Sequence, residues 1–376
     1  MLSNKSSKCV GLAANLVYWA RAAPLRWSAT KRRVVYLDSK MHLISCVLSF
    51  CVIVLYEGFL IFRTIQAVLK LETGGTVSSV VQAAYAVCTY AIPIHFQLNT
   101  FHLWKSIPVF MNSYLDWYDM VKKDFLIPPR SAPFKNGSET LFKVFYALGC
   151  LINFQNAILL MVSPHKTFFL SSLMPEPRKL GLTIRLLFLM LHSFIWLNFW
   201  SQILFYGHIL YSYAFPGIFI LGELRRAPST RTIQDLRRPD IFIKMYRTFQ
   251  VEQMFFNYCL QNLFFPGHKV LMGGLAVLST YGAIKVHSPR AILMGFAAFT
   301  SLLYLSILFR RLGRFFEVSS EVLHSWQGQT HYMRAFLRSC KPLSVNIGNY
   351  YIAKKTTVLC MWGIIINMTI NLLLSF

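Results

Sequence analysis

Acidic residues are scarce in this chain of 376 residues. It has 14 Asp or Glu against 38 Lys or Arg, for a formal net charge of +24, and only 14% of its residues are charged. Ordinary soluble domains carry about 25% charged residues. Hydrophobic residues make up 55% of the chain, and its mean hydropathy is +0.46. This composition excludes a soluble globular protein and indicates one embedded in a lipid bilayer.

Paired cysteines and clustered histidines are lacking as well. The eight Cys residues include no CxxC pair and mostly lie in apolar runs, so we expect neither a disulfide framework nor a zinc site. The ten His residues are dispersed, without the clustered pattern of membrane desaturases, and no GxSxG or phosphate-binding loop is present. No basic and aromatic module stands outside the apolar runs, which argues against nucleic acid. We therefore expect no enzyme, no catalytic residues, no metal and no cofactor.

The apolar residues come in runs of roughly 20, the length that a helix needs to cross the hydrocarbon core. Seven such runs predict seven transmembrane helices, at about 41–62, 77–100, 141–162, 183–206, 268–285, 291–309 and 354–375. No internal repeat or low-complexity tract divides the chain. We expect an all-α polytopic membrane protein with a single domain over residues 1–376.

The distribution of basic residues predicts the orientation of this domain. With the N-terminus inside, the cytoplasmic segments carry 29 Lys or Arg and the outer loops carry 7. Because basic residues accumulate in cytoplasmic loops, we expect a cytoplasmic N-terminal segment, residues 1–40, and an extracellular C-terminus. Within that segment, residues 10–20 predict a shallow amphipathic or re-entrant helix rather than a cleaved signal peptide. The orientation, and the lack of DRY and NPxxY motifs, argue against a G-protein-coupled receptor.

Helical patterns continue beyond the predicted spans on the cytoplasmic side. The fourth run extends to Arg225, residues 241–264 lead into the fifth, and apolar residues recur at helical spacing after the sixth. Such helices need apolar partners, so we expect helices 4–7 to extend into a packed cytoplasmic bundle built from about 207–264 and 310–350. Separate helices lying on the membrane surface are the alternative.

The segment SCKPLSVNIGNYY, residues 339–351, separates a basic amphipathic helix from the last apolar run. Pro342 removes a backbone donor, and Gly348 permits a backbone geometry that a Cβ would hinder. We predict that these two residues bound a hinge between a cytoplasmic leg and a membrane helix over residues 354–375.

One face of this last helix is polar. Helical spacing places five residues on it: Cys360, Ile364, Asn367, Asn371 and Ser375. Two Asn side chains in hydrocarbon are costly unless they meet partners or water. They indicate either hydrogen bonds between helices or the lining of a pore surrounded by several subunits. The residues alone leave both interpretations open.

The end of the chain resembles the last helix of the arthropod odorant and gustatory receptor superfamily, through RSCKPLSVNIGNYY (338–351) and then TTVLCMWGIIINMTINLLLSF (356–376). In that family a CKP- or CRP-like start and a glycine precede the final helix of a seven-crossing chain. Gustatory members often close with Thr-Tyr, five apolar residues and Gln-Phe. Here Thr369-Ile370 and Ser375-Phe376 stand instead, one residue short. The chain is similar to a divergent member, and the resemblance does not fix the register of the gate.

The resemblance implies a chemosensory receptor of the plasma membrane that acts as a ligand-gated, non-selective cation channel. Four subunits, alike or including a co-receptor, would join through the cytoplasmic bundle and surround a pore with their last helices. Asn367, Asn371, Leu374 and Ser375 would line or gate that pore. The alternative is a secondary transporter or another multi-pass protein, although Glu57 is the one acidic residue within the predicted spans.

A small organic ligand is the other partner that the resemblance implies, bound among the second, third, fourth and sixth spans. We expect an aromatic wall with a few polar groups to form its site, from six residues: Tyr85, Phe188, His192, Trp196, Phe199 and Tyr304. An aromatic stripe at helical spacing is, however, more often plain packing than a ligand site. His192 alone fits a hydrogen-bonded buried histidine better than a proton sensor or a metal ligand.

Overall fold

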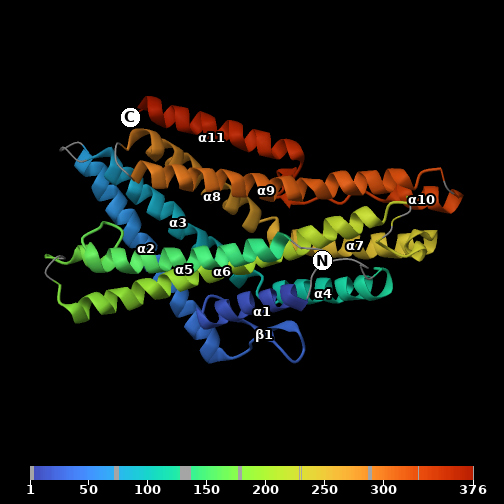
Figure 1. The fold of residues 1–376 in the computed structure, drawn as a ribbon, viewed down its shortest axis with the longest axis horizontal. Helices are drawn as coiled ribbons and strands as arrows, with labels where there is room; N and C mark the ends of the chain where they lie inside the picture. The colour runs from blue at the N-terminus through green and yellow to red at the C-terminus, as the bar shows by residue number, and fades with distance from the viewer. Residues whose placement is uncertain are drawn as a thin grey trace.

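Helices form almost the whole of the computed structural model (Figure 1). It describes residues 4–71, 76–127, 137–176, 180–227, 229, 231–286, 290–328 and 330–375. The α-helices are α1 (Asn4–Trp19), α2 (Lys40–Leu71), α3 (Val77–His102), α4 (Ser106–Asp124), α5 (Gly137–Val162), α6 (Leu182–Glu223), α7 (Pro239–Leu260), α8 (Phe264–Lys285), α9 (Arg290–Ser325), α10 (His331–Ser339) and α11 (Lys355–Ser375). Two short 3-10 helices, η1 (Leu170–Leu173) and η3 (Gln234–Arg237), and two hairpins, β1–β2 (Leu25–Ser28, Arg33–Tyr36) and β3–β4 (Asn346–Ile347, Tyr351–Ile352), complete the described elements.

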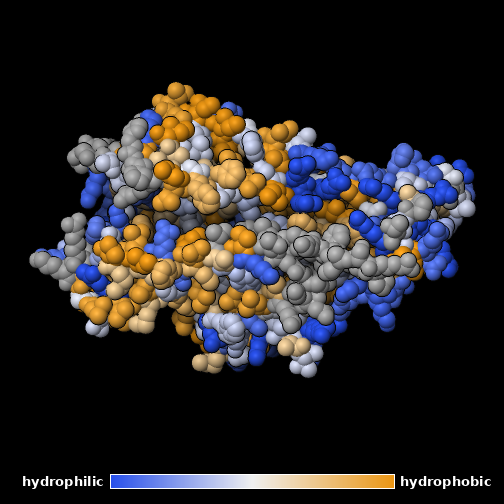
Figure 2. Space-filling view, in the orientation of Figure 1, coloured by the Kyte–Doolittle hydropathy of each residue, from blue (hydrophilic) through white to orange (hydrophobic). Residues whose placement is uncertain are grey.

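All seven predicted spans coincide with helices, namely α2, α3, α5, α6, α8, α9 and α11. Among the described residues, five of them (α2, α3, α6, α9 and α11) are long and apolar enough to cross a membrane. Helix α8, with 22 residues, is about 33 Å long, close to the thickness of the hydrocarbon core. Hydrophobic side chains cover the end of the molecule where α2, α5, α6 and α11 lie (Figure 2). The predicted all-α membrane fold is confirmed.

A polar bundle occupies the opposite end, where Figures 1 and 2 show α7 and α10 among hydrophilic side chains. Helices α6 and α9 continue into it from the apolar half, as expected. Stacked aromatic pairs fill its core: the Tyr213 and Phe256 rings lie 4.2 Å apart, and those of Phe242 and Trp326 lie 4.3 Å apart. Because these rings are fully buried, the extensions form a packed bundle rather than separate surface helices.

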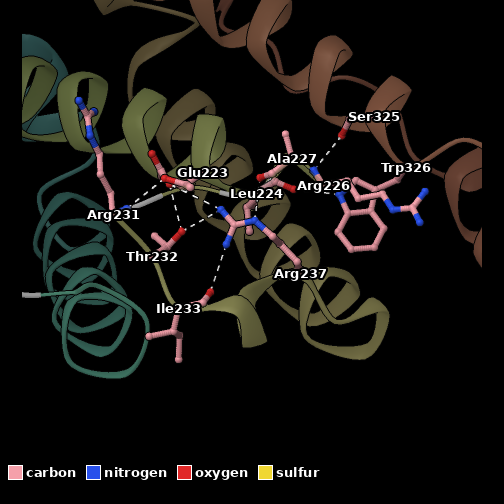
Figure 3. A network of polar contacts seen from close by, with 11 residues as sticks. Glu223, Leu224, Arg226, Ala227, Arg231, Thr232, Ile233, Arg237, Ser325 and Trp326 are labelled. Carbon is pink, nitrogen blue, oxygen red and sulfur yellow. Dashed lines mark hydrogen bonds and ion pairs between the residues drawn. The ribbon is translucent and has the colours of Figure 1, made fainter.

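A buried ion pair closes the end of α6 within this bundle (Figure 3). The Arg237 guanidinium lies 3.9 Å from the Glu223 carboxylate, with both side chains at most 13% exposed. Arg237 also donates to the Ala227 carbonyl (2.8 Å), and Thr232 donates to Glu223 (3.1 Å). The Trp326 indole donates to the Leu224 carbonyl at 2.9 Å. The end of α6, the loop that follows it and the end of α9 are thus held together by groups that would otherwise lack partners.

The N-terminal helix lies deeper than predicted. Val10, Ala14 and Val17 of α1 are at most 1% exposed, and α1 packs against α6. The turn after it is fixed by two amides, since the Gln202 and Gln97 side chains donate to the Ala22 carbonyl at 2.8 and 3.2 Å. The predicted helix is present, and its apolar face is buried against α6 rather than on a membrane surface because small side chains let the two helices approach closely.

An extended strap, residues 340–354, joins α10 to α11. Leu343, Val345 and Ile347 alternate inward and are at most 4% exposed. Gly348 closes the tight β3–β4 turn with a φ of +58°, a conformation that favours glycine. The chain therefore breaks between its last two helices where Pro342 and Gly348 were singled out. The break is a strap packed on the bundle rather than a free linker.

Candidate ligand cavities and pore helix

The larger of two adjoining cavities has a volume of about 480 Å³ and lies between α3, α5, α6, α8 and α9. Four of these helices are the second, third, fourth and sixth predicted spans. The lining is aromatic and aliphatic with a few uncharged polar groups, among them Gln82, Thr89, Gln155 and Asn156. Phe168, in the segment between α5 and η1, also lines it. That segment is held to α2 by a 2.6 Å hydrogen bond from the Tyr56 hydroxyl to the Phe168 carbonyl.

The smaller cavity has a volume of about 250 Å³ and lies toward the polar bundle along the same helices. The two cavities share five lining residues: Ile92, Ile152, Trp200, Ile203 and Met272. The remaining wall combines aromatic rings with hydroxyl groups and one imidazole: Phe96, Tyr206, Tyr211, Phe264, His268, Phe296, Thr300, Ser301 and Tyr304. Together the two cavities form a long space among the spans.

The six residues predicted to bind ligand fall into three places. Tyr85, Trp196 and Phe199 line the larger cavity, and Tyr304 lines the smaller one. Phe188 and His192 lie away from both, around a void of about 10 Å³, too small for any ligand. The His192 imidazole accepts a 2.8 Å hydrogen bond from the Trp196 indole. His192 is therefore a hydrogen-bonded buried histidine that orients a lining residue.

The face of α6 that meets the cavities is displaced by about one helical turn from the predicted face. Trp196, Phe199, Trp200 and Ile203 line the larger cavity at i, i+3, i+4 and i+7 spacing. The aromatic stripe continues to Trp200, so the sequence shows that the stripe extends beyond the predicted residues. It does not show toward which end of α6 the lining is shifted. The adjacent amides on α5 were also missed. Polar residues within an apolar run were the available signal for them.

The chemistry of the lining defines the ligands that fit. Neither cavity is lined by an Asp, Glu, Lys or Arg residue among the described part of the chain. A charged ligand would lose its hydration without gaining an opposite charge. The lining instead suits a neutral, mostly apolar molecule with one or two hydrogen-bonding groups.

Helix α11 lies along α8 and α9 and packs on them through one face, which carries Thr357, Met361, Ile365 and Thr369. The four predicted pore residues, Asn367, Asn371, Leu374 and Ser375, are exposed in the single chain. Neither Asn side chain is hydrogen-bonded to a described residue. The polar face of α11 is therefore not satisfied by the part of the chain that the structure describes, and contacts between the described helices do not account for it.

Helix α9 connects the smaller cavity to α11. Ser301 and Tyr304 face the cavity, whereas Ser306 accepts a 2.9 Å hydrogen bond from the indole of Trp362 in α11. Farther along α9, Gly313 lies so close to the start of α11 that a Cβ there would be 2.6 Å from the Lys354 carbonyl carbon. One rigid helix thus contacts both candidate functional elements.

Comparisons with known proteins agree with this geometry. No family model and no curated protein sequence matches the chain. The fold is similar to that of the insect olfactory receptor OR5 from Machilis hrabei, with a TM-score of 0.62 and 10% identity over 98% of each chain. The structure of the same receptor in complex with eugenol matches with the same values. The chain therefore has the fold of an insect olfactory receptor, and the resemblance drawn from its last helix is confirmed at the level of the fold.

Proposed function

We propose that this protein is a chemosensory receptor subunit and a ligand-gated, non-selective cation channel, opened by a small organic odorant or tastant. Similarity of fold over the full length of a solved olfactory receptor supports the receptor function. The observation that carries the channel function is the exposed polar face of α11, with two Asn side chains that find no partner among the described residues. Such a face is costly in hydrocarbon and favourable around a wet axis.

In this proposal four subunits of a plasma-membrane receptor meet through the polar bundle, on the cytoplasmic side. Each contributes α11 to a central pore, with Asn367 and Asn371 facing the permeating cations and Leu374 and Ser375 near the outer gate. Amide dipoles coordinate cations weakly, so that ions enter and leave. The partner subunits are copies of this chain or include a co-receptor.

Ligand binding and pore opening are coupled through α9 in this proposal. A ligand between α3, α6 and α9 shifts the equilibrium only if it fits the open state better than the closed one. Because α9 also holds α11 through Ser306 and Trp362, a small shift of α9 reaches the pore. The strap that starts near Pro342 and turns at Gly348 is the joint that lets α11 move relative to α10.

Expression in oocytes, alone and with a co-receptor subunit, tests the proposed function. Under a panel of odorants and tastants, we expect agonist-evoked currents carried by Na⁺ and K⁺ alike. The purified protein should be a tetramer in mild detergent. A monomer that moves substrate without current would instead support a secondary transporter, although no described Asp or Glu lines the cavities to bind a coupling ion.

A further inference from the structure

The wall of the smaller cavity contains a hydrogen-bonded polar pair. The imidazole Nε2 of His268 in α8 lies 3.0 Å from the Tyr304 hydroxyl in α9. His268 is 3% exposed, and its other ring nitrogen, Nδ1, is buried without a hydrogen-bond partner among the described residues. Ser301, one turn from Tyr304 on the same face of α9, also lines the cavity. A buried polar atom without a hydrogen-bond partner is costly. This pair is therefore suited to a ligand that supplies a hydrogen-bond partner for Nδ1.

The pair offers one donor and one acceptor in either tautomer of a neutral imidazole. If the Tyr304 hydroxyl donates to Nε2, then Nδ1 carries the proton and is a free donor, while the phenol oxygen remains an acceptor. If Nε2–H donates to the hydroxyl, then Nδ1 is a free acceptor and the phenol proton is the donor. A hydroxyl group on a ligand can satisfy both partners, whereas an ether or a carbonyl can only accept.

The cavities are long as well as apolar. Along α9, lining residues extend from Leu293 in the larger cavity to Tyr304 in the smaller one, a rise of about 16 Å. A molecule that reaches the polar pair while its apolar part fills the larger cavity is therefore elongated. Trp200, which lines both cavities, contacts it in the middle.

We propose that the smaller cavity is a specificity subsite for the hydroxyl group of an elongated, neutral alcohol or phenol, held by His268 and Tyr304. The inference rests on the proposed receptor function and names the ligand class that this receptor prefers. The apolar part of the ligand lies in the larger cavity against Trp196 and Trp200. Ligands too short to span both cavities forgo the hydrogen bonds at the far end.

Binding of 1-decanol and its methyl ether to the purified protein in nanodiscs tests the subsite, with tryptophan fluorescence as the readout. We expect the alcohol to bind about tenfold more tightly than the ether, the effect of about one buried hydrogen bond. Tyr304→Phe should abolish this preference because it removes the hydroxyl alone. Tyr85→Phe, a matched change in the larger cavity, should keep it. No preference in the unmodified protein, or a preference that survives in Tyr304→Phe, would overturn the proposal.

A second variant serves if Tyr304→Phe does not fold. Ser301→Leu narrows the smaller cavity, so it should weaken binding of 1-decanol while leaving 1-butanol unchanged. Equal loss for both alcohols would contradict a subsite at that end. Currents recorded in parallel separate the two proposals. Alcohols that bind in this pattern without evoking current overturn the channel function alone, and agonist currents without an alcohol preference overturn the subsite alone.

Discussion

Glu252 is a buried carboxyl in the polar bundle, where α7 packs on α4. It is 3% exposed, it accepts a 2.5 Å hydrogen bond from Ser113, and its other oxygen has no partner among the described residues. Burial raises the pKa of Glu252, and the Ser113 hydrogen bond offsets part of that shift. The folded state thus binds this proton more tightly than the unfolded state does. Its contribution to stability is largest in acid and is lost as the pH rises from the usual glutamate pKa through the raised one.

Glu252→Gln should therefore stabilise the bundle at neutral pH, by about 1–3 kcal/mol, since an amide fills the same space without a buried charge. At mildly acidic pH the variant and the unmodified protein should unfold at nearly the same temperature. Thermal unfolding in detergent over this pH range measures the effect. Glu321→Gln, at an exposed carboxylate, is the control and should change little. A lower unfolding temperature for Glu252→Gln at neutral pH would show that the buried charge stabilises the fold.

Two neighbouring arginines provide a matched test of burial. Arg237 pairs with Glu223 where both side chains are at most 13% exposed, whereas Arg238 pairs with Asp240 where both are at least 60% exposed. Arg237→Ala leaves the Glu223 charge buried and unpaired, so we expect a loss of about 3–5 kcal/mol in the free energy of unfolding. Arg238→Ala should cost at most about 1 kcal/mol. Chemical denaturation of the two variants side by side compares them, and equal losses would contradict the account of this ion pair.

At the scale of elements, the contact between α9 and the start of α11 is close because backbone meets backbone there. Gly313→Ala would place a Cβ 2.6 Å from the backbone of Lys354, whereas at Gly295 of the same helix the nearest atom to a Cβ is 3.8 Å away. We expect Gly313→Ala to cost about 1–3 kcal/mol, as overpacking does, and to alter the resting open probability. Gly295→Ala should leave both unchanged. Thermal unfolding and leak currents report the two effects, and a silent Gly313→Ala would argue against a fixed α9–α11 contact.

The hydrogen bond between Trp362 and Ser306 is the second link between these helices. Trp362→Phe keeps an aromatic ring but removes the donor, so the open–closed equilibrium should shift by about fivefold, the effect of about 1 kcal/mol. Ligand affinity measured on the purified protein should not change. Dose–response curves and binding curves separate the two quantities. A change in binding without a change in gating would place Trp362 in the ligand site instead of the coupling path.

Sequence patterns predicted the apolar spans and their extensions but not every element or the packing between elements. Run length and periodicity predicted every span and the extended helices, because those signals are local. No prediction covers α4, whose amphipathic residues 106–124 pack on α7. The burial of α1 and the meeting of His268 with Tyr304 depend on contacts between distant residues. The level along α6 at which the helix meets the cavities, with Trp200 rather than Phe188 in the lining, also depends on its neighbours, so the ligand site was predicted only in part.

At the scale of the whole molecule, the protein is divided into an apolar half and a polar bundle (Figure 2). The cavities lie in the apolar half, α9 runs through both halves, and α11 lies along one side with its polar face exposed (Figure 1). An exposed Asn pair on an apolar helix is unfavourable for an isolated chain in lipid. In the proposed channel this cost is relieved because several α11 helices share a wet axis.

The most direct measurement is the ion selectivity of agonist-evoked currents in Asn371→Ala. Asn371 faces the axis in this account, so we expect changed reversal potentials under mixed-cation conditions and changed rectification, with agonist affinity unaltered. Ile366→Ala, at an exposed position on another face of α11, should conduct as the unmodified protein does. Currents that keep the same selectivity and rectification in Asn371→Ala would contradict the assignment of α11 as the pore helix.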